Sequence, residues 1–429
     1  MTRCGTNGVA IREGPLSTSP LDRRRVLAGL SAGAALSFTP WTGAQAEGRP
    51  LKGYIRTNWS QDPFAFGSYS YVAKGGWQNM RRALETPIDE QLFFAGEAAY
   101  PYRNSTVHAA YESGRRVAGF VRRANKDNIA IIGAGMSGLS AAHALWEEGR
   151  TVTVFEARDR IGGRVWTSDQ MGMALDLGAS WIHGVRRNPL TRLSNELALE
   201  RLRTDDSTII RGRNGAEISD RDAPDWLENV VAFQHSAGAD KSDINLRAYL
   251  MQDDYSGGDV MFRAGYGPIF KALEGDYALR LDATVTNITL DDYGVSIGLI
   301  DGSTSRFDAA IITLPLGVLK KNTVTFDPIL PAEKRAAING LGMGTLDKVY
   351  LLYDTPFWAT DHSWIATPDN DLPPGQFNQW LNLHRLIDQP VIVAFNGGPP
   401  ALELAALPDE EVVSRALQTL DLAYPPDPT

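Results

Sequence analysis

The sequence predicts an α/β fold of more than one domain. Its 429 residues exceed the size of one ordinary domain. Hydrophobic residues make up 43% and charged residues 22% of the chain, which is typical of soluble globular proteins. Residues 128–155 read as a short apolar strand, a glycine-rich turn, a helix and a second strand. That alternation is typical of a parallel sheet covered by helices.

Each element of this unit has its own sequence signal. Residues 128–132 (NIAII) form a short apolar run, as expected for a buried strand. The turn GAGMSG follows at 133–138, and a helix is expected from about 139 to 148, where Gly149 ends it. Residues 151–155 (TVTVF) are the second strand and are followed by Glu156.

The glycine spacing predicts a dinucleotide site. Gly133 permits a tight turn, Gly135 lets the backbone approach a pyrophosphate, and Gly138 lets helix and strand pack closely. The helix N-terminus at Met136 and Ser137 offers free N–H groups to the phosphates. A carboxylate at the end of the second strand, Glu156, can accept the ribose hydroxyls and disfavours a 2′-phosphate, which leaves FAD or NAD.

The next residues favour FAD. The strand end continues as EARDRIGGRVWT over 156–167, which includes Ala157 and Arg158. Gly162 and Gly163 allow a second close backbone approach, with Arg164 beside it, as a long pyrophosphate-bridged cofactor requires.

At this point the sequence resembles the flavin-containing amine oxidases, which include monoamine and polyamine oxidases and the related histone demethylases. The stretch at 156–164 matches their E-A-R-x-R-x-G-G-R pattern, and 176–184 (DLGASWIHG) is close to the polyamine oxidase branch. Two further matches lie at 285–320 and 341–358. The resemblance implies a Rossmann-like FAD-binding domain and a discontinuous substrate domain of mixed sheet plus helices. It adds these cofactor-binding residues: Gly178, Ala179, Ser180, Trp181 and Val285.

The resemblance also implies catalytic residues. Lys348 matches the lysine that holds a water against flavin N5, and Tyr69 matches one wall of the family's aromatic cage. Trp59 is expected near Lys348 and the flavin ring. His183 matches a position that lines the active site of polyamine oxidases, although a hydrogen-bonded core histidine is an equal alternative.

One family motif stands in an unexpected place. Residues 92–97 (LFFAGE) and 106–114 (TVHAAYESG) resemble the segment that normally ends such enzymes, yet here they precede the glycine motif. The resemblance assigns Gly96, Glu97, Thr106 and Val107 to the cofactor site. The simplest interpretation is circular permutation, because permutation is tolerated where termini are close. A rearrangement introduced by sequence assembly or cloning is the alternative.

The expected organisation follows from these matches. Residues 1–46 are an export signal, 119–127 a linker, and the FAD domain takes 80–118, 128–185 and 260–318. The substrate domain takes 51–79, 186–259 and 319–429.

Two substitutions within the family pattern carry expectations. Ser68 stands where monoamine oxidases have the cysteine that bonds the flavin, so FAD is expected to be noncovalent. Thr106 replaces an aromatic cage residue, and Tyr100, Tyr102 or Trp380 is a candidate substitute.

The N-terminal 46 residues have the parts of a twin-arginine export signal. The basic residues at 23–25 precede an Ala/Gly-rich apolar run, and Ala-Gln-Ala at 44–46 supplies a cleavage site. A periplasmic or secreted location and the twin-arginine export machinery as a partner are therefore expected, without a stable membrane anchor. Removing this segment would lower the formal charge from −9 to −12, which argues against nucleic acid as a partner.

The expected reaction is oxidation of an amine to an imine, with O2 as electron acceptor and H2O2 as product. An L-amino-acid oxidase of the same fold is one alternative, and it would need an arginine such as Arg103 or Arg385 for the substrate carboxylate. A flavin-binding protein without oxidase activity is another. The histidines show no metal-ligand spacing, and the sequence leaves the oligomeric state open.

Overall fold

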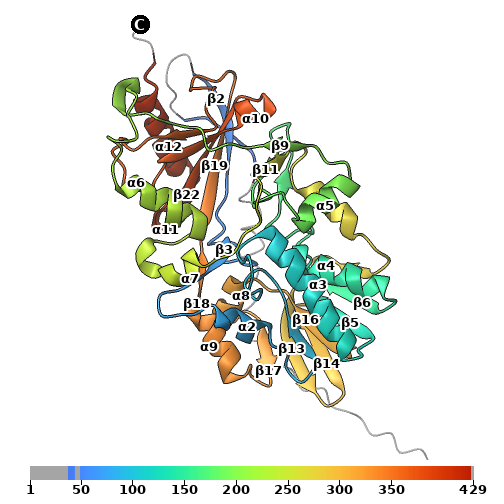
Figure 1. The fold of residues 1–429 in the computed structure, drawn as a ribbon. Coiled ribbons are helices and arrows are strands. Elements are labelled where there is room, and N and C mark those ends of the chain that lie inside the picture. Colours follow the sequence, from blue (N-terminus) through green and yellow to red (C-terminus); the bar gives the residue numbers. More distant parts are fainter. Residues whose placement is uncertain (1–36, 44–48, 427–429) are drawn as a thin grey trace, which may run out of the picture.

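The computed structural model describes residues 37–43 and 49–426, and these form two halves. In Figure 1 a seven-stranded sheet with helices α10 (Leu383–Ile387), α11 (Pro399–Ala405) and α12 (Asp409–Ala423) occupies the upper half. The lower half contains a five-stranded parallel sheet and the helices that cover it. The mixed α/β architecture agrees with the expected fold class.

The five-stranded sheet has the order β12-β6-β5-β16-β4, and its strands are parallel. Strands β5 (Asn128–Ile132) and β6 (Thr151–Phe155) occur where the sequence predicts them. Helix α4 runs over Met136–Glu147, so it begins three residues earlier than expected. Both residues that precede Gly138 in this helix are buried, because the first turn packs directly against the sheet. The other strands are β16 (Ala309–Ile312), β12 (Ala278–Arg280) and β4 (Leu92–Phe94).

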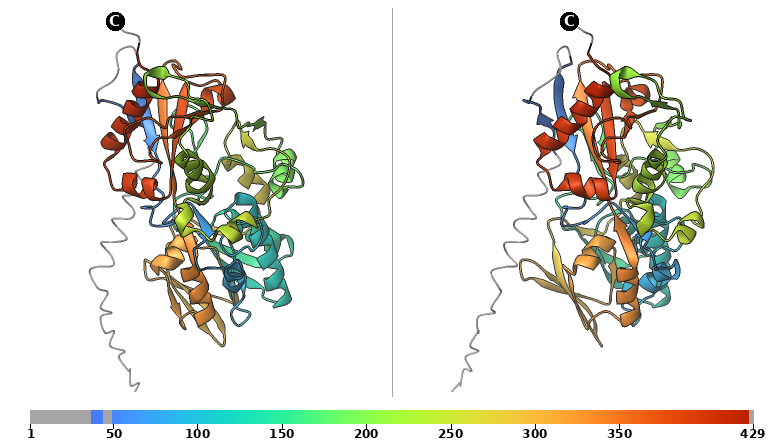
Figure 2. Two further views of the ribbon diagram at one scale, coloured as in Figure 1. Left: turned by 60° about the vertical axis from the view of Figure 1, so that its left-hand side comes forward. Right: turned by 90° about the vertical axis from the view of Figure 1, so that its left-hand side faces the viewer.

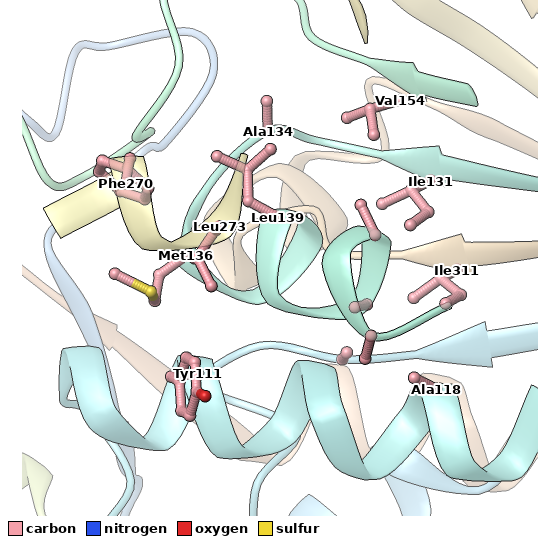
Figure 3. Packing of buried hydrophobic residues seen from close by; sticks show 14 of the residues in the cluster. Tyr111, Ala118, Ile131, Ala134, Met136, Leu139, Val154, Phe270, Leu273 and Ile311 are labelled. Atoms are coloured by element: carbon pink, nitrogen blue, oxygen red, sulfur yellow. The ribbon is translucent and has the colours of Figure 1, made fainter. Parts of the chain in front are cut away.

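The segment that the sequence places out of order completes this sheet. Strand β4 is its edge and pairs in parallel with β16. Helix α3 (Val107–Arg123) lies against α4, and a Cβ on Gly114 would come within 2.1 Å of the Ser137 carbonyl oxygen. Figure 3 shows Tyr111 and Ala118 of α3 facing the same buried cluster as Met136 and Leu139 of α4.

The expected linker at 119–127 is wrong in its first half. Helix α3 continues to Arg123, so only residues 124–127 connect it to β5. The helix persists because Val117, Ala118 and Val121 are buried on one face, which gives it an amphipathic pattern.

Two further sheets flank the cofactor half. A four-stranded sheet has the order β15-β14-β13-β17, and β18 (Leu341–Gly344) pairs with β3 (Tyr69–Val72). The four strands are β13 (Val285–Asp291), β14 (Gly294–Leu299), β15 (Thr304–Phe307) and β17 (Thr325–Asp327).

The seven-stranded sheet has the order β1-β2-β19-β22-β21-β20-β10. Helices α11 and α12 cover one of its faces (Figure 2). Its strands are β1 (Thr39–Pro40), β2 (Leu51–Arg56), β10 (Thr208–Ile210), β19 (Leu346–Tyr353), β20 (Trp364–Ala366), β21 (Gln379–Asn382) and β22 (Val391–Gly397).

The remaining elements are short. The strands are β7 (Thr167–Ser168), β8 (Leu175–Asp176), β9 (Arg201–Arg203) and β11 (Val260–Phe262). The helices are α2 (Asn79–Glu85), α5 (Pro189–Glu196), α6 (Trp226–Asn229), α7 (Leu246–Leu250), α8 (Leu316–Lys321) and α9 (Ala332–Gly340). The helical turns are η2 (Arg213–Gly215), η3 (Val230–His235, a π-helix), η4 (Lys241–Asp243) and η5 (Gly267–Leu273).

Most of the expected export signal, including the cleavage site at 44–46, lies outside the described residues. Within residues 37–43, strand β1 pairs with β2. Among the described helices, none has the length and apolar character needed to cross a bilayer.

Two glycine-to-alanine substitutions test this arrangement. A Cβ on Gly138 would lie 1.9 Å from the Gly133 carbonyl oxygen, so Gly138→Ala must push α4 away from the sheet. We expect a loss of about 1–3 kcal/mol in unfolding free energy and loss of bound flavin. Gly119→Ala is the matched control, because its Cβ meets no atom closer than 3.8 Å. Inside a helix it should stabilise by roughly 0.5–1 kcal/mol. Denaturant unfolding checks both, and destabilisation by Gly119→Ala would contradict the helical assignment.

Candidate active site

One cavity of about 1350 Å³ brings the predicted site residues together. It passes between the two halves of the molecule and takes lining residues from both. The predicted residues that line it are Trp59, Tyr69, Gly96, Glu97, Thr106, Val107, Gly133, Gly135, Met136, Ser137, Glu156, Ala157, Arg158, Gly162, Gly163, Arg164, Gly178, Ala179, Ser180, Trp181, His183, Val285 and Lys348. Gly138 does not line the cavity and instead packs against Gly133, the packing role expected of it.

The turn before α4 forms a cradle at one end of the cavity. Gly133 has a φ of +109°, in the left-handed region that favours glycine. A Cβ on Gly135 would meet only the Gly162 carbonyl oxygen, at 3.9 Å, so the backbone here faces open space. The hydroxyl of Ser137, in the first turn of α4, is buried and has no hydrogen-bond partner. A phosphate would satisfy this donor and the free N–H groups of the helix N-terminus.

Glu156 lies at the end of β6 and is fixed by backbone contacts. Its two carboxylate oxygens accept hydrogen bonds from the Ala134 N–H at 2.8 Å and the Arg158 N–H at 3.0 Å. Arg158 itself donates to Asp62 at 2.6 Å, and both side chains are about nine-tenths buried. This ion pair joins the segment around Asp62 to the dinucleotide motif.

A buried network surrounds Glu97. Its carboxylate accepts from Arg164 at 2.9 Å and from the Ser70 hydroxyl at 2.6 Å. Burial alone raises the pKa of Glu97, but the charges of Arg164 and Arg81 bring it below its usual range. Arg81, which sequence reasoning missed, is fully buried, and burial lowers its pKa to about 10. The network fixes the 96–97 turn, where a Cβ on Gly96 would project into open space.

These features fit FAD. The cradle, the ribose carboxylate and the second glycine pair all face the same elongated cavity, and it is large enough for a dinucleotide together with a small substrate. When bound, FAD would be held by these residues and would supply the two-electron redox chemistry.

Lys348 sits in the wall of the substrate end, on β19. Its amino group donates to the Asp176 carbonyl at 2.8 Å, the Gly178 carbonyl at 2.7 Å and the Ser180 hydroxyl at 2.7 Å. Burial lowers the pKa of Lys348, and the nearby Asp176 carboxylate opposes that shift. Burial likewise raises the pKa of Asp176.

The preceding residue, Asp347, holds another part of the wall. It accepts from the Trp59 N–H at 2.8 Å and the Thr57 hydroxyl at 3.0 Å. Burial raises the pKa of Asp347 to about 7. The Trp59 ring donates to the Leu177 carbonyl at 3.2 Å, which places it beside the segment that Lys348 binds, as expected.

Tyr69 lines the cavity, and its hydroxyl is engaged by the protein, so its ring is the part available to a substrate. The hydroxyl donates to the main-chain carbonyl of His235, and burial raises the pKa of Tyr69 far above its usual range. His235, which the sequence did not single out, closes the π-helix η3 and contacts Gln379 through Nδ1 at 2.5 Å. Burial lowers the pKa of His235 to about 4, so its ring is neutral.

The expected substitutes for the missing cage residue are wrong. Trp380 is fully buried in the core of the seven-stranded sheet, and neither Tyr100 nor Tyr102 lines the cavity. Aromatic walls come instead from Trp181, Trp364 and Phe395, whose rings lie within 6.1 Å of one another. Trp181 belongs to the 176–184 motif and was expected at the cofactor site, whereas Trp364 and Phe395 match no motif, which is why the sequence did not reveal them. Thr106 does line the cavity and caps α3 by accepting from the Ala109 N–H at 3.1 Å.

The arginines considered for a carboxylate substrate are also misplaced. Arg103 pairs with Asp253 at 3.1 Å and Arg385 with Asp205 at 2.9 Å, and neither lines the cavity. The arginines that do line it, Arg158 and Arg164, are already paired with carboxylates.

His183 lies at the substrate end, 2.7 Å from Asp259. Although burial raises the pKa of Asp259, the hydrogen bond and charge of His183 lower it below its usual range. Asp206 and Asp254 line the same end of the cavity. In the part of the chain that the structure describes, no group of three or more His, Cys, Asp or Glu residues is placed to hold a metal.

Comparison with known proteins decides the family. The model of the flavin-containing amine oxidoreductases matches residues 34–121, 136–228 and 208–429. The chain belongs to this family. The protein is therefore a flavin-dependent amine oxidoreductase with FAD as its cofactor.

Individual relatives agree. Probable polyamine oxidase 4 of Arabidopsis thaliana is 31% identical over 365 residues, covering 70% of this chain and 73% of its own length. Polyamine oxidase 4 of Oryza sativa subsp. japonica is 30% identical, covering 70% and 74%.

Solved structures share the fold. Putrescine oxidase with bound putrescine superposes with a TM-score of 0.54 at 20% identity, covering 70% of this chain and 82% of that one. Cyclohexylamine oxidase from Brevibacterium oxydans gives the same TM-score and coverage at 21% identity.

Ser68 leads to a prediction about the flavin linkage. Its hydroxyl donates to the Leu346 carbonyl at 2.9 Å and lines the cavity, and a hydroxyl cannot form the thioether that a cysteine forms. We expect acid precipitation of the purified enzyme to release all of its flavin into the supernatant. Yellow colour retained in the washed pellet would contradict this.

Proposed function

We propose that this enzyme oxidises amines that carry two or more positive charges, with O2 as electron acceptor. The products are an imine, which water hydrolyses to an aldehyde or ketone, and H2O2. The observation that carries the proposal is the arrangement of acidic side chains beyond an aromatic chamber in the same cavity as the cofactor cradle.

The path from Lys348 to the acids follows direct contacts. The Lys348 amino nitrogen lies 5.9 Å from the centre of the Trp181 ring, and that ring stacks on His183 with centroids 6.4 Å apart. His183 then contacts Asp259 at 2.7 Å. An amine whose reacting carbon lies near Lys348 can therefore extend along Trp181 and place a second ammonium group beside Asp259. A diamine gains a charge-assisted contact with this carboxylate in addition to its His183 contact, whereas a monoamine has no second ammonium group to reach it.

The chain's own residues prepare the reaction by position and desolvation. Tyr69, Trp181 and Phe395 supply apolar ring surface that excludes water from the amine. The neutral ring of His235 adds no positive charge that would repel the substrate. Lys348 is the one cation lining this end of the cavity within the described residues, and its donors are engaged by the protein.

The relatives support the substrate class by their names alone: two are polyamine oxidases, and a solved neighbour is a putrescine oxidase with bound putrescine. The absence of an unpaired arginine among the described lining residues argues against a substrate carboxylate, and so against an L-amino-acid oxidase.

Anaerobic reduction of the flavin tests the proposal. We expect putrescine, spermidine or spermine to bleach the enzyme at lower concentrations than benzylamine or cyclohexylamine do. Asp259→Asn should raise the KM for the diamine about tenfold and leave that for the monoamine nearly unchanged, because only the second ammonium loses its partner.

Asp253→Asn is the matched control, since Asp253 is exposed and lies outside the cavity. Bleaching by L-amino acids alone would contradict the proposal in favour of the rival oxidase. Flavin that no amine reduces would favour a binding protein without oxidase activity.

We also propose that the segment order is a circular permutation of the family's order. Arg49 donates to the main-chain carbonyls of Tyr424 and, at 3.0 Å, Pro425, so the start of the 49–426 range lies beside its end. Each alignment above covers 70% of this chain, and residues 128–429 make up about the same share. The family model matches residues 34–121 in a segment of their own. Peptide mapping of the purified protein across 118–129 should recover this junction, and its absence would indicate a rearranged sequence.

A further inference from the structure

We propose that Lys334 is a positioning residue for FAD, acting through helix α2 and the turn at residues 96–97. Lys334 lies in the first turn of α9, is 3% exposed and does not line the candidate active-site cavity. Its role is independent of which amine is oxidised, because it concerns how the cofactor is held.

The amino group of Lys334 caps the C-terminal end of α2, which lies beside α9 in the lower half of Figure 1. It donates to the main-chain carbonyls of Ala83 at 3.2 Å, Leu84 at 2.7 Å and Thr86 at 2.7 Å. The last carbonyls of a helix have no partner within the helix, and a cation beside them is favoured by the helix dipole. A helix of only seven residues is not stable alone, so the position of α2 depends on such contacts.

Helix α2 carries Arg81 to the cofactor turn. Arg81 is fully buried and donates to the Ser70 hydroxyl at 2.7 Å and the Ala98 carbonyl at 3.0 Å. The Ser70 hydroxyl in turn donates to the Glu97 carboxylate at 2.6 Å. A displacement of α2 would therefore move the groups that hold Glu97, which lines the cavity beside Gly96.

Lys334 also contacts the strand that leads into the same turn. Its amino nitrogen lies 4.0 Å from the centre of the ring of Phe94, the last residue of β4. An ammonium group close to an aromatic ring is attracted to the face of that ring. Gly96 follows two residues later. Lys334 thus contacts both elements that set the position of the 96–97 turn, α2 through its carbonyls and β4 through Phe94.

An ion pair holds the same end of α2 from another side. The buried Glu85 pairs with Arg116 of α3 at 2.8 Å. Helix α3 begins at Val107, which lines the cavity as well. Removing the Lys334 amino group takes a donor from three carbonyls but leaves this ion pair in place. The expected defect is therefore a shift of α2 and of the cofactor turn.

A double-mutant cycle in FAD affinity tests the proposal. Apoenzyme is prepared from Lys334→Met, Arg81→Met and the double variant, and FAD binding is titrated by flavin fluorescence. Lys320→Met is the matched control, because Lys320 likewise donates to three main-chain carbonyls, but at the end of α9 instead of α2. No amine is present, so the result does not depend on the proposed function.

We expect Lys334→Met to weaken FAD binding about tenfold and Arg81→Met at least as much. The double variant should lose clearly less than the product of the two single effects, because both residues act on one turn. Lys320→Met should bind FAD within about twofold of the wild-type affinity. Wild-type affinity in Lys334→Met, or losses that multiply in the double variant, would overturn the proposal.

Hydrogen–deuterium exchange of the wild-type enzyme provides a second test that needs no variant. If α2 is coupled to the cofactor, the amides of residues 79–86 exchange more slowly with FAD bound than in the apoenzyme. Helix α12, in the upper half of Figure 1, is the reference and should exchange alike in both forms. Equal exchange of residues 79–86 in both forms would contradict the proposal, even if a variant failed to fold.

Discussion

The three hydrogen bonds of the Lys348 amino group are the constraint on which the site depends. They tie a central strand of the substrate sheet to residues 176–180, which belong to the cofactor half. The neighbouring Asp347 ties the same strand to Thr57 and Trp59, in the segment that precedes the glycine motif. Two adjacent residues thus join three parts of the chain around one cavity. A buried ammonium is costly unless its donors are satisfied, and here each of them has an acceptor.

Residues 51–118, which precede the glycine motif, add a second set of contacts around the site. Asp62 pairs with Arg158, and Glu97 pairs with Arg164. Two arginines of the 156–164 motif are thus bound by carboxylates from residues 51–118. Strand β4 fills the edge beside β16, and α3 packs against α4. These contacts bring residues 51–118 into the same site as the glycine motif.

Much of the cofactor site was predictable because its residues serve the backbone. Gly133, Gly135 and Glu156 act through local geometry, and local spacing is visible in a sequence. The substrate end was less predictable. Trp364 and Phe395 meet Trp181 across the seven-stranded sheet, and no spacing along the chain encodes that meeting.

The incorrect predictions likewise concern residues whose environment depends on the folded chain. Tyr100 and Trp380 were candidates by residue type alone, and burial in the sheet core or location outside the cavity removes them. The helix through 119–123 was missed because these residues were assigned to the linker, whereas Val121 on the buried face continues the amphipathic pattern. Arg81 was missed because its role depends on Glu97 and Ser70, which only the folded chain brings together.

The most direct test of the account is the rate of each half-reaction in Lys348→Met, with Lys52→Met, at an exposed lysine of the neighbouring strand β2, as control. The methionine keeps most of the length of the unbranched side chain and removes the charge and the three hydrogen bonds. If Lys348 organises the reacting end of the cavity, the variant still binds FAD, and flavin reduction by amine or reoxidation by O2 slows by about tenfold or more. Wild-type rates in both half-reactions, with FAD bound, would contradict the account.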